Sequence, residues 1–232
     1  MALRPFSMFS KGGAPTPGAA APRYGHRPYI NGPFSKVDGW LHENYGVVLD
    51  LLDELHAELG VQGHHAEIGV HHGKFFIPLH NMMRAGEKSL AIDIFENQSL
   101  NPDGSGHGDR AVFLDHLKAY GRSPGDVDIL QANSLMIEAR QIAQLQKPSG
   151  NSRFFSIAGS HPARHTFHDF GTAMALIAHG GVIFVDDYYS PHWPGVHEAV
   201  NRHFNAGLPK VAPFLFAYNK LLFTTYDLRD AY

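Results

Sequence analysis

From about residue 38 onward, two kinds of apolar spacing alternate along the chain. Short runs of β-type apolar residues are separated by segments in which apolar residues recur every three or four positions, as on an amphipathic helix. The runs predict strands over residues 65–70, 89–94, 127–131, 154–157 and 182–185. The intervening segments predict helices over residues 38–59, 75–84, 110–120, 135–145, 164–178 and 196–204. Strands that alternate with helices in this way predict a parallel sheet with helices packed on its faces.

The end of the chain breaks this alternation. Two β-type runs, 212–217 and 221–225, are joined through Asn219 and Lys220, with no room for a helix between them. They must therefore pair antiparallel, as a hairpin. The predicted fold class is α/β: a doubly wound, mostly parallel, seven-stranded sheet with a C-terminal antiparallel hairpin. Such sheets bind their ligands at the carboxyl ends of the strands.

Residues 1–35 show neither spacing. Residues 11–22 read KGGAPTPGAAAP, a composition that buries too little apolar surface to offset its ordering entropy. We predict a flexible arm over residues 1–35 and one folded domain over residues 36–232. The alternative is an arm that docks over the site or a neighbouring subunit through its aromatic residues, which are Phe6, Phe9, Tyr24, Tyr29 and Phe34.

Composition narrows the range of partners. The 232 residues include 19 Lys and Arg against 22 Asp and Glu, so nothing in the charge favours a nucleic-acid partner. Cysteine is absent, which excludes disulfides, thiolate metal sites and a cysteine nucleophile. No apolar run approaches the roughly 18–20 residues of a membrane span, and residues 1–10 lack a signal-peptide stretch. We expect a soluble, cytoplasmic protein with a small-molecule partner, no nucleic acid and no membrane; a homo-oligomer is left open.

The ends of the first two predicted strands carry candidate ligand-binding residues. Residues 67–73 read EIGVHHG, and glycines four apart let the chain turn sharply against a ligand. The middle glycine of the dinucleotide pattern G-x-G-x-x-G is missing, which disfavours a pyrophosphate and NAD. Asp93 ends the next strand, where a carboxylate accepts hydrogen bonds from ribose hydroxyls. Together they predict a nucleoside ligand without a pyrophosphate; the alternative is a plain strand–helix turn followed by a helix cap.

These residues, in this order, resemble the class I S-adenosylmethionine-dependent methyltransferases, which also close their sheet with an antiparallel hairpin. Residues 154–161 read FFSIAGSH and residues 180–188 read GGVIFVDDY. Both are similar to the branch that methylates hydroxyls of sugars and other natural products, in which the fourth strand runs into D-G-S-H and the fifth into G-G-V-x-x-x-D-D-Y. The resemblance covers about residues 60–226. It implies a Rossmann-like methyltransferase fold with S-adenosyl-L-methionine as the cofactor.

The resemblance also implies roles for individual residues. It places Glu67, Gly69 and Gly73 around the methionine part of the cofactor. It places Asp93 on the ribose, and Asn133 and Ser134 near the adenine. Gly159 and Ser160 are expected near the reactive sulfur, and Tyr188 and His192 are expected to line the acceptor pocket.

Ala158 departs from the family pattern, which has aspartate at this position. The resemblance implies that this aspartate, with Asp186 and Asp187, holds a divalent cation, usually magnesium. A hard cation prefers oxygen ligands, so the loss of one carboxylate predicts a weakened Mg²⁺ site. A bound metal lowers the pKa of a hydroxyl, and a base must take its proton. His161, whose ordinary pKa is about 6.5, is the candidate base, and Asp186 is the second catalytic candidate.

The leading function is S-adenosylmethionine-dependent O-methylation of a small hydroxylated acceptor, such as a sugar or a glycosylated metabolite. The first alternative is a cofactor-binding protein whose catalysis is weakened or lost because of Ala158. The second is a metal-dependent oxygenase or lyase on the same scaffold, which the 17 histidines favour. This second alternative needs a transition-metal site in which His161, His165 and His168 share one helix face beside Asp169. If Pro162 takes the first helical position, His161 instead lies on the preceding loop.

The loop over residues 97–108 is an expected lid.

Overall fold

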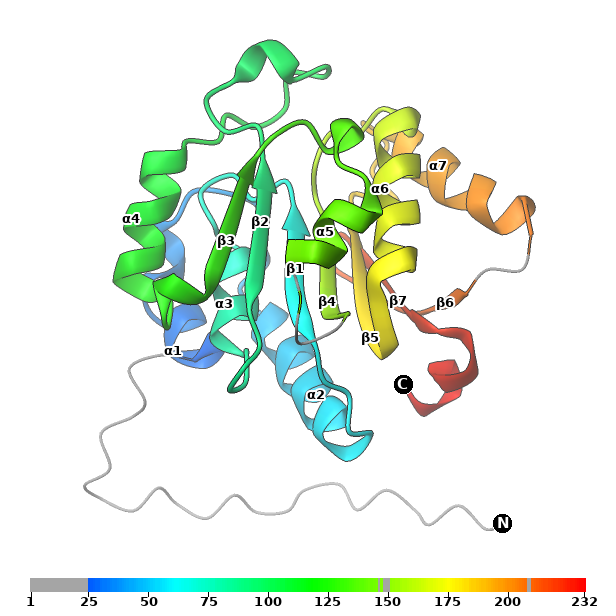
Figure 1. The fold of residues 1–232 in the computed structure, drawn as a ribbon, viewed down its shortest axis with the longest axis horizontal. Helices are drawn as coiled ribbons and strands as arrows, with labels where there is room; N and C mark the ends of the chain where they lie inside the picture. The colour runs from blue at the N-terminus through cyan, green and yellow to red at the C-terminus, as the bar shows by residue number, and fades with distance from the viewer. Residues whose placement is uncertain (1–24, 146, 148–150, 208–209) are drawn as a thin grey trace.

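One seven-stranded sheet forms the centre of the protein, with strand order β3-β2-β1-β4-β5-β7-β6 (Figure 1). The computed structural model describes residues 25–145, 147, 151–207 and 210–232. The strands are β1 (His64–Ile68), β2 (Ser89–Asp93), β3 (Val127–Gln131), β4 (Ser152–Ile157), β5 (Ile177–Asp186), β6 (Val211–Ala217) and β7 (Lys220–Thr225). Strands β1 to β5 pair parallel, and β7 pairs antiparallel with both β5 and β6. The predicted fold class is therefore confirmed.

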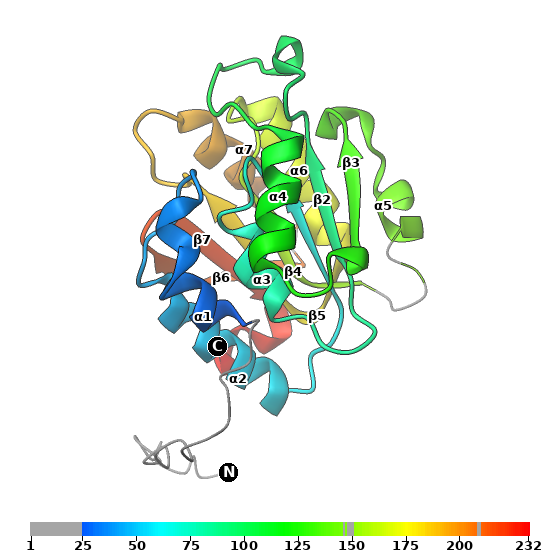
Figure 2. The ribbon, with the colours of Figure 1, turned by 90° about the vertical axis from the view of Figure 1, so that its left-hand side faces the viewer.

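Helices lie on both sides of this sheet (Figure 2). They are α1 (His26–Ile30), α2 (Tyr45–Glu58), α3 (Phe76–Asn81), α4 (Arg110–Tyr120), α5 (Ala139–Leu145), α6 (Ala163–Leu176) and α7 (Pro194–Asn205). One core cluster joins the sheet to α5, α6 and α7, and a second joins it to α1, α2 and α3. Among the described residues, no helix combines the length and the apolar character that crossing a bilayer requires.

The central strands read as uninterrupted apolar runs because both of their faces are buried. In β4, Phe155 belongs to the cluster under α6 and α7, while its neighbour Phe154 belongs to the cluster under α2 and α3. Ile183 and Phe184 of β5 divide between the same two clusters. All four side chains are fully buried. Successive residues therefore anchor opposite helical layers and hold the carboxyl ends of β4 and β5 side by side.

Several predicted helix boundaries were wrong, and two of them have an identifiable physical cause. The helix expected over residues 38–59 begins only at Tyr45, because the segment before it runs along the rim of a cavity, where Trp40 is 68% exposed. The helix expected to end at residue 178 ends at Leu176. Gly180 and Gly181, which suggested a helix stop, instead lie inside β5, where the pairing with β4 shifts register.

The start of the chain also differs from the expected arm over residues 1–35. Residues 1–24, including Phe6, Phe9 and Tyr24, lie outside the described residues. Residues 26–36 form α1 and the 3₁₀ helix η1 (Pro33–Lys36). Their aromatic residues Tyr29 and Phe34 are buried in the cluster that contains α2 and α3. Residues 26–35, which were predicted as part of the arm, therefore belong to the folded part of the chain, because these two rings pack into the core.

Candidate functional site

A cavity of about 390 Å³ opens at the carboxyl ends of β1, β2, β4 and β5. This is the place predicted from the fold class, and the volume suits a small organic ligand. The predicted site residues that line it are Glu67, Gly69, Asp93, Asn133, Ser134, His161, Asp186 and Asp187. The loop between β2 and α4, which was the expected lid, rises above these strand ends (Figure 1).

Gly69 marks the closest approach of β1 and β4. Its φ is +86°, and a Cβ there would lie 2.1 Å from the carbonyl oxygen of Ala158, so no other residue fits without moving backbone. Gly73, at φ +91°, does not line the cavity; a Cβ there would lie 2.9 Å from the ring of Phe113. Gly69 therefore lets backbone form the cavity floor, while Gly73 lets the turn pack against α4.

Glu67 presents an unpartnered carboxylate oxygen beside the cavity. The side chain is buried, and its Oε1 accepts a hydrogen bond of 3.0 Å from Ser156 Oγ. Its Oε2 is buried with no hydrogen-bond partner among the described residues. Burial raises the pKa of Glu67 to about 8, although Lys220 and the Ser156 hydrogen bond oppose this. A buried carboxylate oxygen without a partner fits the amino group of a ligand such as S-adenosylmethionine.

Asp93 holds two turns of the cavity wall together. Its Oδ2 accepts a hydrogen bond of 2.7 Å from the backbone N–H of His71, and its Oδ1 accepts one of 2.6 Å from that of Phe95. Burial raises the pKa of Asp93, and these backbone hydrogen bonds oppose the effect. Each carboxylate oxygen keeps a second lone pair, so Asp93 remains able to accept from ribose hydroxyls. Asn133 caps the 3₁₀ turn Ser134–Met136 by accepting from the backbone N–H of Leu135.

Asp186, at the end of β5, is neutralised from within the protein. Its Oδ2 accepts a hydrogen bond of 2.5 Å from Lys220 Nζ, the first residue of β7. Its Oδ1 accepts hydrogen bonds from the side-chain amide of Asn219 and from the backbone N–H of Asp187. Lys220 is buried, and its ammonium also lies 4.7 Å from the centre of the Phe75 ring. The cavity wall therefore contains a buried ammonium–carboxylate ion pair.

His161 is held at both ring nitrogens. Its Nδ1 lies 3.0 Å from Oδ2 of Asp103, whose same oxygen accepts a 2.7 Å hydrogen bond from the His161 backbone N–H. Its Nε2 lies 3.4 Å from Oδ2 of Asp187, and its ring stacks on Trp193 with 4.0 Å between ring centres. Burial lowers the pKa of His161, but the two carboxylates outweigh burial and raise it above its ordinary value. The arrangement suits a side chain that gains and loses a proton.

The model of a methyltransferase domain family matches residues 66–188, slightly more than half of the chain. The chain belongs to this family. The predicted relationship to S-adenosylmethionine-dependent methyltransferases is thereby confirmed, and the enzyme class with it. No curated protein matches the chain.

Solved structures share the methyltransferase fold at low sequence identity. The O-methyltransferase NovP has a TM-score of 0.61 and 15% identity, covering 75% of this chain and 76% of its own. An O-methyltransferase from Bacillus cereus in complex with S-adenosylhomocysteine has a TM-score of 0.59 and 14% identity, covering 85% and 89%. CalS11, a TDP-rhamnose 3'-O-methyltransferase of calicheamicin biosynthesis, has a TM-score of 0.57 and 15% identity, covering 86% of each chain.

The residues of this methyltransferase do not fit the magnesium site that the family pattern implies. Asp186 is bonded to Lys220 and Asn219, Asp187 faces His161, and Ala158 supplies no side-chain oxygen. The two carboxylates therefore bind different cationic or polar partners. They do not form, together with a third oxygen ligand, the oxygen-lined site that a hard cation needs. Among the described residues, the one group of three potential ligands with mutually close atoms lies elsewhere and does not include them.

The histidine cluster considered for a transition metal does not form. The helix α6 begins at Ala163, so His161 lies on the preceding loop, as Pro162 indicated. His168 pairs with Asp169 at 3.3 Å, and His165 reaches the cavity separately. The two expected acceptor-pocket residues, Tyr188 and His192, do not line the cavity.

The polar side chains that were missed from the sequence include Asp38, Asn219 and Lys220, which line the cavity, and Asp103, which contacts His161. Asp103 and Asn219 lie in irregular segments that carry no periodic signal. Lys220 had a usable signal, because it is a single lysine at the start of the apolar run 221–223. A buried charge of this kind needs a partner, and the nearest strand end offers Asp186.

Proposed function

We propose that this methyltransferase transfers the methyl group of S-adenosylmethionine to a hydroxyl of a small acceptor, a sugar or a glycosylated metabolite. The observation that carries the proposal is that one cavity contains both an unpartnered carboxylate oxygen on Glu67 and an imidazole, that of His161, held by two carboxylates. In the reaction a C–O bond forms as the C–S bond of the sulfonium breaks. The hydroxyl loses its proton and S-adenosylhomocysteine leaves.

The cofactor end of the cavity supports this assignment through three groups. Glu67 accepts from the amino group of the methionine part, and the backbone at Gly69 lies under it. Asp93 accepts from the ribose hydroxyls, held in place by the N–H groups of His71 and Phe95. Asn133 and Ser134 lie on the adenine side. Bound S-adenosylmethionine supplies the electrophilic methyl group, and these residues orient it.

The acceptor end supports proton removal by His161. Its Nε2 faces Asp187 in this structure. In the reactive complex, the acceptor hydroxyl lies on this side of the ring and gives its proton to Nε2. Asp103 holds Nδ1–H and favours the charged imidazolium that results. The ammonium of Lys220 supplies positive charge near the developing oxyanion, a role that the family pattern gives to a metal. The proposed catalytic groups are thus His161 and Lys220, with Asp186 as the positioning residue of Lys220.

The first experiment is calorimetric titration of the protein with S-adenosylhomocysteine, with and without Mg²⁺. We expect micromolar binding that Mg²⁺ leaves unchanged, weakened in Glu67→Gln and retained in Glu58→Gln, which changes an exposed carboxylate of α2. Absence of binding at millimolar ligand contradicts the proposal. A panel of free and nucleotide-linked sugars, assayed for methyl transfer, then tests the acceptor class.

The second candidate function is cofactor binding without efficient catalysis, and Ala158 is the observation that favours it. It predicts the same titration result but no methyl transfer with any acceptor. Turnover with one hydroxylated acceptor separates the two.

A further inference from the structure

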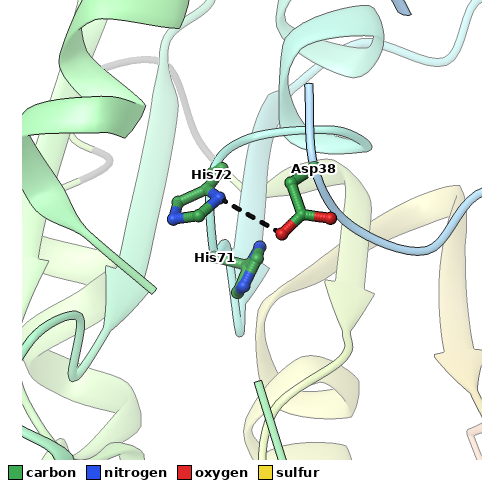
Figure 3. A group of neighbouring side chains, drawn as sticks. All are labelled: Asp38, His71 and His72. Carbon is green, nitrogen blue, oxygen red and sulfur yellow. Dashed lines mark ion pairs between the residues drawn. The ribbon is translucent and has the colours of Figure 1, made fainter. Parts of the chain in front are cut away.

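Three side chains converge beside the cavity without taking part in the proposed reaction; Asp38 and His71 line it, and His72 lies next to them. Asp38 precedes α2, and His71 and His72 form the turn after β1 (Figure 3). One ligand atom from each residue lies within 4.8 Å of the other two. Asp38 Oδ2 is 3.9 Å from His72 Nδ1. In the part of the chain that the structure describes, no other group of histidine and acidic side chains meets this spacing.

One ring nitrogen of each histidine makes no hydrogen bond within the part of the chain that the structure describes. Nδ1 of His71 and Nδ1 of His72 are both buried and have no hydrogen-bond partner among the described residues. Buried polar atoms without hydrogen-bond partners are rare in folded proteins, and a bound metal ion is a partner that satisfies both nitrogens at once. The Asp38 side chain is 82% exposed, and while its Oδ1 accepts a hydrogen bond of 2.9 Å from the Gly39 N–H, its Oδ2 is the oxygen that faces His72.

The backbone around the histidines is fixed independently of their rings. His71 has a left-handed φ of 54°, and its N–H donates to Asp93. The carbonyl oxygen of His72 accepts a hydrogen bond of 3.0 Å from His116 Nδ1. The two rings lie against each other with 4.0 Å between their centres. The turn therefore holds two imidazoles side by side, which lowers the ordering entropy that a ligand must overcome.

We propose that Asp38, His71 and His72 bind one divalent transition metal ion of the zinc or nickel class. Two imidazoles and one carboxylate suit such ions, whereas Mg²⁺ prefers oxygen ligands alone. With metal–ligand bonds of about 2.0–2.1 Å, ligands of a tetrahedral site lie about 3.3 Å apart. To reach that value from the observed spacing, the Asp38 carboxylate swings inward and the two imidazole rings turn toward the ion, and water completes the shell.

A metal at this place joins two segments that are distant in sequence. Gly39, next to Asp38, has a φ of +136°, and a Cβ there would lie 3.7 Å from His71 Nδ1. Trp40 packs on the His71 ring with 5.4 Å between ring centres and lines the same cavity. The ion therefore clamps the segment before α2 to the turn after β1 and closes one side of the cavity rim. Its role is structural and separate from methyl transfer.

The test is titration of the full, untagged chain with Zn²⁺, followed by calorimetry, and with Co²⁺, followed by visible absorption. We expect one equivalent to bind, with the absorption bands of nitrogen and oxygen coordination. Asp38→Asn should weaken binding at least tenfold and His72→Ala should abolish it. His179→Ala, which breaks an exposed histidine–aspartate pair of 2.7 Å with Asp227, is the matched control and should change nothing.

Equal Zn²⁺ affinity in the wild type, Asp38→Asn and His72→Ala overturns the proposal, as does the absence of binding at millimolar metal. Asp38→Asn alters an exposed side chain and keeps the test decisive even where a histidine variant fails to fold. Trp193→Phe leaves Trp40 as the sole tryptophan, so quenching of its fluorescence by Ni²⁺ reports the site directly. Titration of the metal-free protein with S-adenosylhomocysteine is a separate readout, so failure of the proposed function and failure of the metal site are distinguishable.

Discussion

Lys220 and Asp186 form a buried ion pair of 2.5 Å across the junction of β7 and β5, at the wall of the cofactor cavity. The family pattern has a carboxylate cluster with a metal at this strand end, and here one carboxylate is missing at Ala158 while an ammonium is present. In the proposed mechanism, Lys220 supplies the positive charge that a metal would bring. Four predictions test this site and its neighbours.

The first prediction concerns metal dependence. Methyl transfer should proceed at the same initial rate in EDTA and in millimolar Mg²⁺, because Lys220 provides the positive charge. Lys220→Met should lower kcat by about 100-fold or more, a loss typical of removing one group that stabilises a developing oxyanion. Lys118→Met, at an exposed position of α4, should retain the wild-type rate.

Removing Lys220 alone leaves Asp186 buried without its partner, which destabilises a protein by roughly 3–5 kcal/mol. The double variant Asp186→Asn with Lys220→Met avoids this charge and should recover most of the stability, but not the rate. Urea unfolding measures the first quantity and initial rates the second. A rate that falls in EDTA and returns with Mg²⁺ contradicts the internal-cation interpretation.

The second prediction concerns the pH profile of kcat/KM. His161 acts as a base only when neutral, so the rate should rise with pH through a pKa that Asp103 and Asp187 raise above the ordinary histidine value. Asp103→Asn removes one of these carboxylates and should move the acid limb to lower pH. His161→Ala should lower kcat by about 10²–10⁴-fold. An acid limb that is identical in Asp103→Asn and in the exposed control Asp115→Asn argues against the role of Asp103.

The third prediction concerns proton release on cofactor binding. The pKa of Glu67 is raised to about 8, so its carboxyl group is mostly protonated at pH 7 in the empty cavity. Pairing with the amino group of the ligand favours the ionised form. Binding of S-adenosylhomocysteine at pH 7 should therefore release a proton, and affinity should rise with pH until about pH 8. Calorimetry in phosphate and in Tris measures the release, which should vanish in Glu67→Gln.

The fourth prediction uses Ala158→Asp, which restores the residue of the family pattern. Under the proposed function, the added carboxylate places negative charge near Asp186 and does not increase the metal-free rate. A rate that increases by orders of magnitude, with or without Mg²⁺, would instead identify the natural protein as a cofactor binder with impaired catalysis. The assay is methyl transfer by wild type and variant across a Mg²⁺ series.

Most of the fold was predictable because strands and helices differ in apolar period, and residues 212–225 leave room only for a hairpin. The boundary errors have physical causes. Trp40 fits the apolar spacing of a helix, so the predicted helix began too early; in the structure its side chain lines the cavity instead. Gly180 and Gly181 were interpreted as a helix stop, because the sequence does not show that β5 continues through them with a shift in register.

The site was predictable where it follows the strand ends. Glu67, Gly69, Asp93 and Asp186 share the cavity because the carboxyl ends of parallel strands meet at one edge of the sheet. Asp103 was not predictable as a partner of His161, because it lies 58 positions away in a segment without a period. Its contact exists only after the loop between β2 and α4 takes its position.

The region matched by the family model ends at Tyr188, whereas the ammonium that neutralises Asp186 belongs to residue 220. A fragment cut at the matched boundaries keeps the carboxylate of this ion pair and loses its ammonium group. The candidate site is thus not contained in the half of the chain that the family model matches. The last hairpin, whose sequence predicts only the closing edge of the sheet, supplies the cation of the ion pair in the cavity wall.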